Sequence, residues 1–197
     1  MNLTVRIRAM TREDIDEVLE IERASFPDPW SRDAFHATLL LPYAHYYVAE
    51  LREERQSAEA TSRTQEAALQ SSEAAPHPPE AAQQTLEAAQ RTPKAAVPLV
   101  TRIVAECGVR DIMGEGEITN VAVHPDFRGQ GIARQMMKHV LQDSLIKGMT
   151  AFTLEVRAGN QPAIALYERF GFRTEGIRQA FYEDPVEDAL IMWLRQK

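Results

Sequence analysis

The chain has 197 residues, 44% of them hydrophobic, and a formal net charge of −7. This length favours a single domain. No apolar run approaches the ~20 residues of a membrane span. The chain also lacks the clustered Lys and Arg that binding to nucleic-acid phosphates requires. The N-terminus has no apolar signal segment, which predicts a cytoplasmic protein. With one cysteine and no zinc-type histidine spacing, we expect no metal. That cysteine, Cys107, lies in a strand-like apolar run, which favours a buried structural thiol over a nucleophile.

The first fifty residues predict one strand and two helices. Alternating apolar residues favour a strand over residues 2–8, and Thr11 followed by Asp14 is typical of a capping box at the start of a helix. That helix must end near Ser25, because two prolines follow, and Ser31 can cap a second short helix. The aromatic residues between the helices either form an exposed loop or plug the helix junction.

Two further strands, at about 43–51 and 100–109, are separated by a repetitive segment, residues 52–98. The unit E-A-A recurs there every seven residues. A coiled coil would need two large apolar positions per heptad, whereas this segment offers alanine pairs and several helix-breaking prolines. We therefore expect 52–98 to be a disordered insert, because it has too few apolar groups to offset the entropy lost on ordering. Residues 1–51 and 99–197 are expected to form one domain.

A strand at 117–123 leads into the segment with the clearest chemical signal. Gly129 and Gly131 stand between this strand and a helix-period run that ends near Lys147. Two glycines at such a junction let successive backbone N–H groups point into one concavity at the positive end of the helix, which is an anion cradle. The alternative is a glycine-rich turn that caps an ordinary helix. The motifs of P-loops and of dinucleotide-binding turns are absent from the sequence.

The remaining chain predicts a strand at 150–156, a short helix capped by Asn160, and strands at about 172–181 and 187–195. The element order indicates an α/β (α+β) fold with a mixed, mostly antiparallel sheet flanked by helices. In a sheet of this kind a ligand is expected at the C-terminal ends of the strands, where neighbouring strands diverge.

Arg128-x-x-Gly131-x-Ala133 after a V-A-V strand resembles the acetyl-CoA loop of the GCN5-related N-acetyltransferase (GNAT) superfamily. The resemblance implies the GNAT fold, with the cofactor in a V between its fourth and fifth strands, here 117–123 and 150–156, and with the insert in the hairpin of its second and third strands. It also implies that the loop amides bind the CoA pyrophosphate and that the preceding strand pairs with the pantetheine arm. The residues expected to bind acetyl-CoA are Val121, Ala122, Val123, Arg128, Gly129, Gln130, Gly131, Ile132, Ala133, Arg134, Asn160 and Tyr167.

Two residues are candidates for catalysis. Acetyl transfer to an amine needs an acceptor for the proton of the amine and a proton for the departing thiolate. Glu155 is either that acceptor or half of a surface pair with Arg157, and its surroundings, L-E-V-R-x-x-N, are similar to the alanine-acetyltransferase pattern in which the Glu is the base. Tyr167 lies seven residues after Asn160, on the same helix face. The match to A-L-Y-x-x-x-G-F implies that Tyr167 protonates the thiolate, the alternative being a core tyrosine.

The segment F-P-D-P-W-S and the motif L-E-V-R-x-x-N resemble one subgroup, the ribosomal-protein alanine N-acetyltransferases of the RimI type. The ending R-x-x-x-Y…E-D-A-x-x-M is similar to that subgroup's R-x-Y-Y…E-D-A-x-x-M. Here Phe181 replaces the first tyrosine, and the spacing from Arg178 to the aromatic pair is one residue longer.

The resemblance implies an acetyl-CoA-dependent N-alpha-acetyltransferase that acetylates the N-terminal alanine of a small-subunit ribosomal protein by direct transfer. The expected partners are acetyl-CoA and the N-terminal tail of that protein, with no nucleic acid and no membrane. Two alternatives stay open: a GNAT acetyltransferase of a small-molecule amine, and a non-catalytic acyl-CoA-binding module with the insert as a docking arm.

Overall fold

The computed structural model describes residues 4–54 and 99–195. The chain divides into two compact units, one made of Met1–Leu51 with Thr101–Lys197 and the other of Arg52–Val100. Within the described residues, the first unit contains helices α1, α2, α5 and α6, the core and the candidate site. The insert 52–98 is predicted to be disordered, and its residues 55–98 lie outside the described part of the chain.

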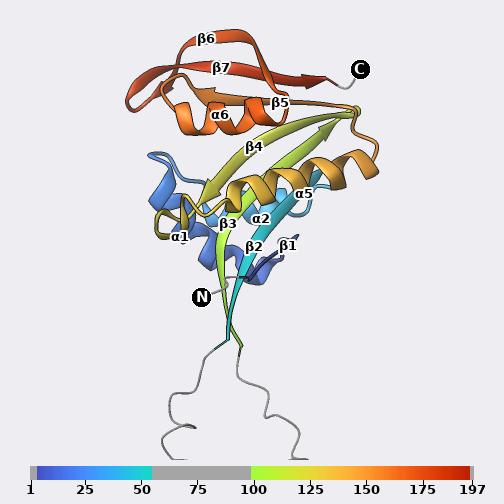
Figure 1. Ribbon diagram of the computed structural model, residues 1–197, viewed down its shortest axis with the longest axis vertical. Coiled ribbons are helices and arrows are strands. Elements are labelled where there is room, and N and C mark those ends of the chain that lie inside the picture. The colour runs from blue at the N-terminus through green and yellow to red at the C-terminus, as the bar shows by residue number, and fades with distance from the viewer. Residues whose placement is uncertain (1–3, 55–98, 196–197) are drawn as a thin grey trace, which may run out of the picture. The chain divides into compact units, whose positions relative to one another are not determined.

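One mixed sheet forms the centre of the first unit (Figure 1), in the order β1-β2-β3-β4-β5-β7-β6. Strand β4 pairs in parallel with β5, whereas the pairs β3–β4, β5–β7 and β6–β7 are antiparallel. The strands are Thr4–Ala9 (β1), Ala44–Glu54 (β2), Leu99–Ile112 (β3), Glu115–Val123 (β4), Ala151–Arg157 (β5), Arg173–Glu183 (β6) and Val186–Arg195 (β7). The predicted mixed, mostly antiparallel sheet is confirmed, although β2 runs three residues past its expected end at Leu51.

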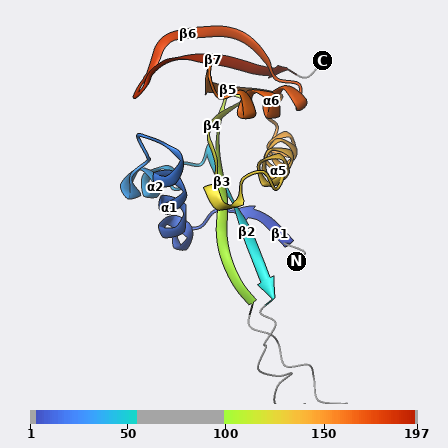
Figure 2. The ribbon, with the colours of Figure 1, turned by 60° about the vertical axis from the view of Figure 1, so that its left-hand side comes forward.

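Helices cover both faces of the sheet (Figure 2), with α1 and α2 on one side and α5 on the other. The helices are Ile15–Ser25 (α1), Arg32–Thr38 (α2), Ile132–Ile146 (α5) and Gln161–Arg169 (α6), with short 3-10 turns at Arg12–Asp14 (η1) and Pro125–Phe127 (η2). In the described ranges, no helix is long and apolar enough to cross a membrane. Because side chains alternate along a strand, β2 sends Tyr46 and Val48 into the core beneath α1 and α2 and Tyr47 and Ala49 into the core beneath α5.

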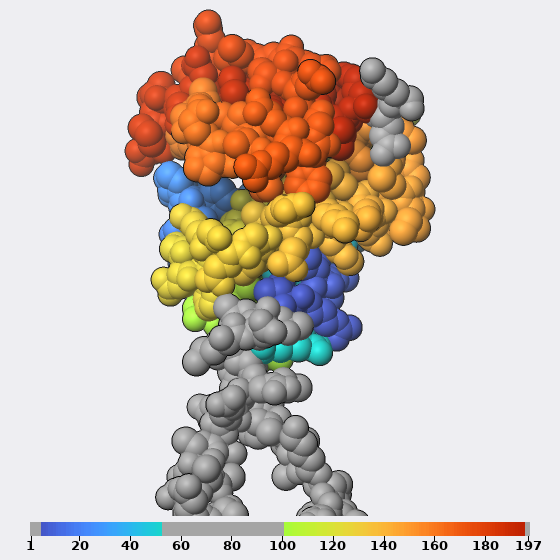
Figure 3. Space-filling view, in the orientation of Figure 1, coloured from blue at the N-terminus to red at the C-terminus, as the bar shows by residue number. Residues whose placement is uncertain are grey.

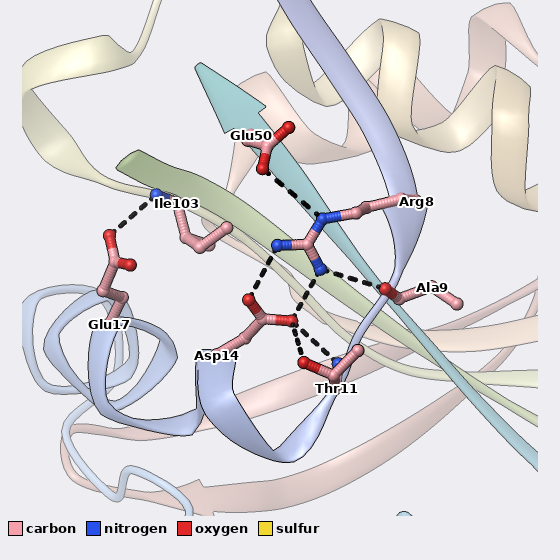
Figure 4. A network of polar contacts seen from close by, with 7 residues as sticks. All are labelled: Arg8, Ala9, Thr11, Asp14, Glu17, Glu50 and Ile103. Atoms are coloured by element: carbon pink, nitrogen blue, oxygen red, sulfur yellow. Dashed lines mark hydrogen bonds and ion pairs between the residues drawn. The ribbon is translucent and has the colours of Figure 1, made fainter. Parts of the chain in front are cut away.

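The predicted helix starts are confirmed by their caps. The Thr11 amide donates to Asp14 Oδ2 at 2.7 Å, and the Ala34 amide donates to Ser31 Oγ at 3.1 Å. Asp14 also accepts two hydrogen bonds from Arg8 of β1, at 2.7 and 2.8 Å, so the capping residue ties the start of α1 to the sheet (Figure 4).

A β-bulge interrupts the β3–β4 ladder. Gly108 lies opposite Asn120, but Val109 lies opposite Ile118, so Thr119 is an extra residue on β4. An extra residue bends a strand and increases its local twist. The bulge therefore turns the second half of β4 away from its earlier course.

The pairing of β4 with β5 stops at the same place. It covers only Glu115 to Ile118 on β4 and Ala151 to Leu154 on β5. Beyond these residues the two parallel strands diverge, which confirms the V expected between 117–123 and 150–156.

The bulge leaves no room for a side chain at Gly108. A Cβ atom there would lie 2.5 Å from each of Asn120 Oδ1, Thr119 Oγ1 and Tyr46 Cε1. Gly108→Ala is therefore expected to lower the free energy of unfolding by about 2 kcal/mol, the usual cost of overpacking, measured by denaturant unfolding. Gly176→Ala is the matched control, because its Cβ would lie 3.3 Å from the flexible Ile191 Cδ1, and its loss should be clearly smaller. Equal losses would contradict this account of the bulge.

Candidate active site

A pocket of about 280 Å³ opens where β4 and β5 diverge. Its walls come from the end of α1 and the loop before α2, the bulged part of β4, the end of β5, and α6. Glu155, Asn160 and Tyr167, three of the residues singled out in the sequence, all line it. The structure thus brings together both candidate catalytic residues, from two different elements, in one cavity. We call it the V pocket.

Tyr167 belongs both to the wall of the V pocket and to the core. Its side chain is only 7% exposed and packs with the Phe172 ring, with 5.9 Å between ring centroids. Burial raises the pKa of the Tyr167 phenol well above its ordinary value. The phenol therefore stays protonated at neutral pH and is available as a proton donor.

Glu155 lies on the more open side of the V pocket. Its side chain is 31% exposed, and Oε1 forms an ion pair with Arg178 Nη1 at 3.0 Å. The alternative surface pair between Glu155 and Arg157 is wrong, because Arg157 binds Glu187 at 3.1 Å instead. Register explains this outcome: β5 lies beside β7, which carries Glu187 and places it within reach of Arg157.

A second bulge absorbs the extra residue noted in the C-terminal motif. Arg178 lies opposite Ala189, and Tyr182 opposite Glu187, so three residues of β6 face a single residue of β7. Ala180 takes the left-handed conformation there, with φ of 48°. Beyond the bulge, Tyr182 lines the V pocket, and the Arg157 guanidinium lies 4.1 Å from its ring centroid.

The loop before α5 has the geometry of an anion cradle. Gly129 and Gly131 have φ values of 76° and 77°, which glycine adopts without strain. Among the described residues, no backbone amide from 129 to 134 has a hydrogen-bond acceptor. These donors precede and begin α5, so they point into an open, positively polarised site. The space-filling view shows this loop at the surface (Figure 3).

A second pocket, lined by this loop and by α6, is the place where the predicted cofactor residues gather. Val123 lines it, whereas Val121 lines the V pocket and Ala122 packs in the core beneath α1. Gln130 stands apart, because its side chain donates to the Asp126 carbonyl at 3.5 Å. The predicted residues that line this pocket are Val123, Arg128, Gly129, Gly131, Ile132, Ala133 and Arg134.

Two predicted cofactor residues also have partners within the protein. The guanidinium of Arg128 donates to the Val123 carbonyl at 2.9 Å and to Ser25 Oγ at 3.1 Å, which ties the cradle to the ends of β4 and α1. Asn160 Oδ1 accepts from the Ala163 amide at 3.3 Å and so caps α6, as its type predicts.

Sequence reasoning missed a buried polar cluster at the V pocket. Glu22 of α1 and Glu106 of β3 are completely buried, and Asn120 of β4 is 9% exposed. A signal was available, because Glu22 lies on the apolar face of α1 and Glu106 interrupts an apolar strand. Burial, with Glu22 beside it, raises the pKa of Glu106 well above its usual range. The neighbouring Cys107 is buried as predicted, and burial raises the pKa of its thiol.

A splayed parallel strand pair, with an amide cradle at one end and a pocket holding a carboxylate and a phenol at the other, is the arrangement expected of an acetyltransferase of the GNAT class. The model of the Acetyltransferase (GNAT) family matches residues 62–172, more than half of the chain. The chain belongs to this family, which confirms the predicted fold and the predicted enzyme class.

Several proteins similar to this chain carry the name of one acetyltransferase subgroup. A Bacillus subtilis (strain 168) protein, provisionally named a ribosomal protein bS18-alanine N-acetyltransferase, is 31% identical over 98% of this chain and 97% of its own length. The Escherichia coli (strain K12) ribosomal protein bS18-alanine N-acetyltransferase is 41% identical over 42% of this chain and 57% of its own length. The crystal structure of the E. coli ribosomal-protein-S18-alanine N-acetyltransferase has a TM-score of 0.66 at 23% identity, covering 98% of this chain and 94% of that one. The subgroup resembled by the sequence is thus also the one found among the relatives.

The buried state of Glu106 predicts a pH-dependent stability. Between the ordinary glutamate pKa and the raised one, the native protein holds a proton that the unfolded chain releases, so stability falls by up to about 1.4 kcal/mol per unit as pH rises. Glu106→Gln removes this loss. From pH 5 to 7 the free energy of unfolding of the wild type should therefore fall relative to that of the variant, measured with urea. The exposed Glu20→Gln, on α1, should follow the wild type. Parallel curves for Glu106→Gln and the wild type would refute the raised pKa.

Proposed function

We propose that the protein transfers an acetyl group from acetyl-CoA directly to the N-terminal alanine of a small-subunit ribosomal protein, in the cytoplasm where such proteins are made. One observation carries the proposal: Glu155 and Tyr167 line the same pocket at the point where β4 leaves β5. The names of the relatives support the choice of acceptor.

The open edge of β4 and the cradle fit acetyl-CoA. The amides of 129–134 are unused donors at a helix start, which suits a pyrophosphate, and Arg134 and Arg169 add positive charge to the same pocket. After Ile118 the edge of β4 toward β5 is free of ladder pairing among the described strands, which suits the amides of a pantetheine arm. Acetyl-CoA supplies the thioester from which the acetyl group leaves.

Glu155 and Tyr167 have the roles of base and acid. An α-amino group has a pKa near 8, so a carboxylate at the pocket wall is able to take its proton, directly or through one water. Tyr167 is protonated and donates a proton to the departing thiolate. Because both groups serve one direct transfer, the step needs no acyl-enzyme, and the buried Cys107 has no part in it.

The acceptor is proposed from charge as well as from the relatives. The chain carries a net charge of −7, and Glu155 lies at the more open side of the pocket, which together favour a cationic amino terminus followed by a basic tail. The V pocket is near the lower end of the size range of small-molecule pockets, so it accommodates the reacting end of a longer acceptor.

The test is thiol release from acetyl-CoA with short peptides that differ only at residue one and with a set of small amines. We expect kcat/KM to be at least about tenfold higher for an N-terminal alanine peptide with a basic continuation than for the other acceptors, a difference of about 1.4 kcal/mol in transition-state binding. Activity on small amines alone would favour a small-molecule acetyltransferase. Binding of CoA without turnover of any amine would favour the non-catalytic module.

The cradle predicts a selective loss of cofactor affinity in Gly131→Ala. A Cβ atom there meets open space, so the change acts only through the left-handed backbone, at a cost of about 1–2 kcal/mol. Relaxation of that strain would turn the amides away from the anion, and we expect the Kd for CoA, measured by calorimetry, to rise about tenfold. Gly148→Ala is the matched control, because Gly148 also has a positive φ and open space but lies at the other end of α5. It should lose similar stability and keep its CoA affinity, and equal affinities in both variants would refute the cradle.

Tyr167→Phe removes the proposed acid and keeps the ring in the core. Because general acid catalysis typically contributes at least about 10²-fold, kcat should fall by about that factor. The Kd for acetyl-CoA should stay within about twofold, since the packing is kept. Tyr43→Phe, at an exposed tyrosine that lines neither pocket, is the control. Unchanged turnover in Tyr167→Phe would remove Tyr167 from the mechanism.

A further inference from the structure

The buried cluster beneath the V pocket has no role in the proposed chemistry. It joins three elements, because Glu22 comes from α1, Glu106 from β3 and Asn120 from β4. The side-chain amide of Asn120 donates to Glu106 at 2.8 and 2.7 Å and to Glu22 at 3.2 Å. Glu22 and Asn120 also line the V pocket.

Glu22 and Glu106 lie beside each other in this cluster, and burial together with that neighbour raises the pKa of Glu106 well above its usual range. A raised pKa favours the protonated form of Glu106, which can donate toward Glu22. Glu22 Oε1 accepts from the Asn120 side-chain amide, and Oε2 remains as an acceptor for a further donor.

The second oxygen of Glu22 holds the loop that walls the V pocket. The backbone amide of Trp30 donates to Glu22 Oε2 at 2.7 Å. Trp30 packs on Phe35 and Tyr46, with ring centroids 5.4 and 5.9 Å away, so the aromatic residue plugs the helix junction and also lines the pocket. The loop is tied separately at its start, where Ser25 accepts from Arg128. Glu22 therefore sets the position of the far end of the loop.

We propose that Glu22 is a positioning residue for the acceptor: through the Trp30 amide it fixes the loop 26–30 against the catalytic wall of the V pocket, and Glu106 and Asn120 keep its carboxylate in place. The proposal rests on the proposed function, since it assigns the V pocket to the acceptor. Four residues of this loop line the V pocket but not the second pocket beside the cradle: Phe26, Pro27, Asp28 and Trp30. Loss of the Glu22–Trp30 bond should therefore weaken acceptor binding and spare the cofactor.

Two conservative variants separate the reach of Glu22 from its charge. Glu22→Asp keeps the charge but withdraws the carboxylate by about one C–C bond, ~1.5 Å, which breaks the bond to the Trp30 amide. Glu22→Gln keeps the reach, because its amide oxygen still accepts from the Trp30 amide while its NH₂ group faces Glu106 as a donor. The variant loses only the 3.2 Å contact from Asn120. Glu20→Asp and Glu20→Gln, exposed on the same helix, are the matched controls.

The readouts are hydrogen exchange of the Trp30 amide without ligand and the KM values for peptide and acetyl-CoA. In Glu22→Asp we expect exchange of the Trp30 amide to be about tenfold faster and the KM for the peptide to be about tenfold higher. A tenfold change corresponds to the loss of about one hydrogen bond to a charged group. The KM for acetyl-CoA should stay within about twofold of the wild-type value. Glu22→Gln and both controls should stay within about twofold of the wild type in all three. A purely structural role would raise both KM values together.

Three results would overturn the proposal: unchanged exchange in Glu22→Asp, an equal rise of both KM values, or a larger effect in Glu22→Gln than in Glu22→Asp, which would assign the role to charge. If the wild type acetylates no peptide, the proposed function fails, and with it the assignment of the pocket to the acceptor. The exchange measurement still decides whether Glu22 anchors the loop, because it needs no substrate.

Discussion

The extra residue at Thr119 is the constraint on which the site depends. Strand β4 has to pair with β3 along its length and yet leave β5 after Ile118, and the bulge meets both demands by bending β4 at that point. The free edge that results provides unpaired backbone groups, and the gap beside it becomes the V pocket. Gly108 permits this arrangement, because the bulged residues occupy the volume of its missing side chain. A single irregularity in the ladder thus places backbone donors, a carboxylate and a phenol around one space.

The two parts of the site along β4, the cradle and the V pocket, depend on different kinds of interaction. At the cradle, the groups proposed to bind an anion are backbone amides, so the important residues are the glycines that allow the loop its positive φ values. Most side chains there are exposed. At the V pocket, the groups are side chains held by burial and by partners from other elements, such as Tyr167 in the core and Glu155 beside Arg178. The first part depends on local chain geometry and the second on tertiary packing.

The buried pair of Glu22 and Glu106 shows how packing adds a constraint to chemistry. Burying a charge is costly unless it is hydrogen-bonded, and replacement of such groups by apolar residues is often neutral or stabilising. Here every oxygen of the pair accepts a hydrogen bond, from the Asn120 side-chain amide on β4 or from the Trp30 amide in the loop before α2. The cluster therefore fixes four segments relative to one another directly beneath the proposed acceptor site.

The sequence by itself determined the features that depend on local pattern. Strand alternation, the capping residues Thr11, Ser31 and Asn160, and the glycines before α5 all act within a few residues, so the element order and the cradle were predictable. The candidates Glu155 and Tyr167 came from the resemblance of their motifs to those of the family. Only the tertiary structure decided which side chains meet. The partners of Glu155 and Arg157 follow from the register of β5, β6 and β7, and the contact between Glu22 and Glu106 joins residues far apart in the chain. Such contacts are set by how strands pair and helices pack, and a local pattern carries no information about either.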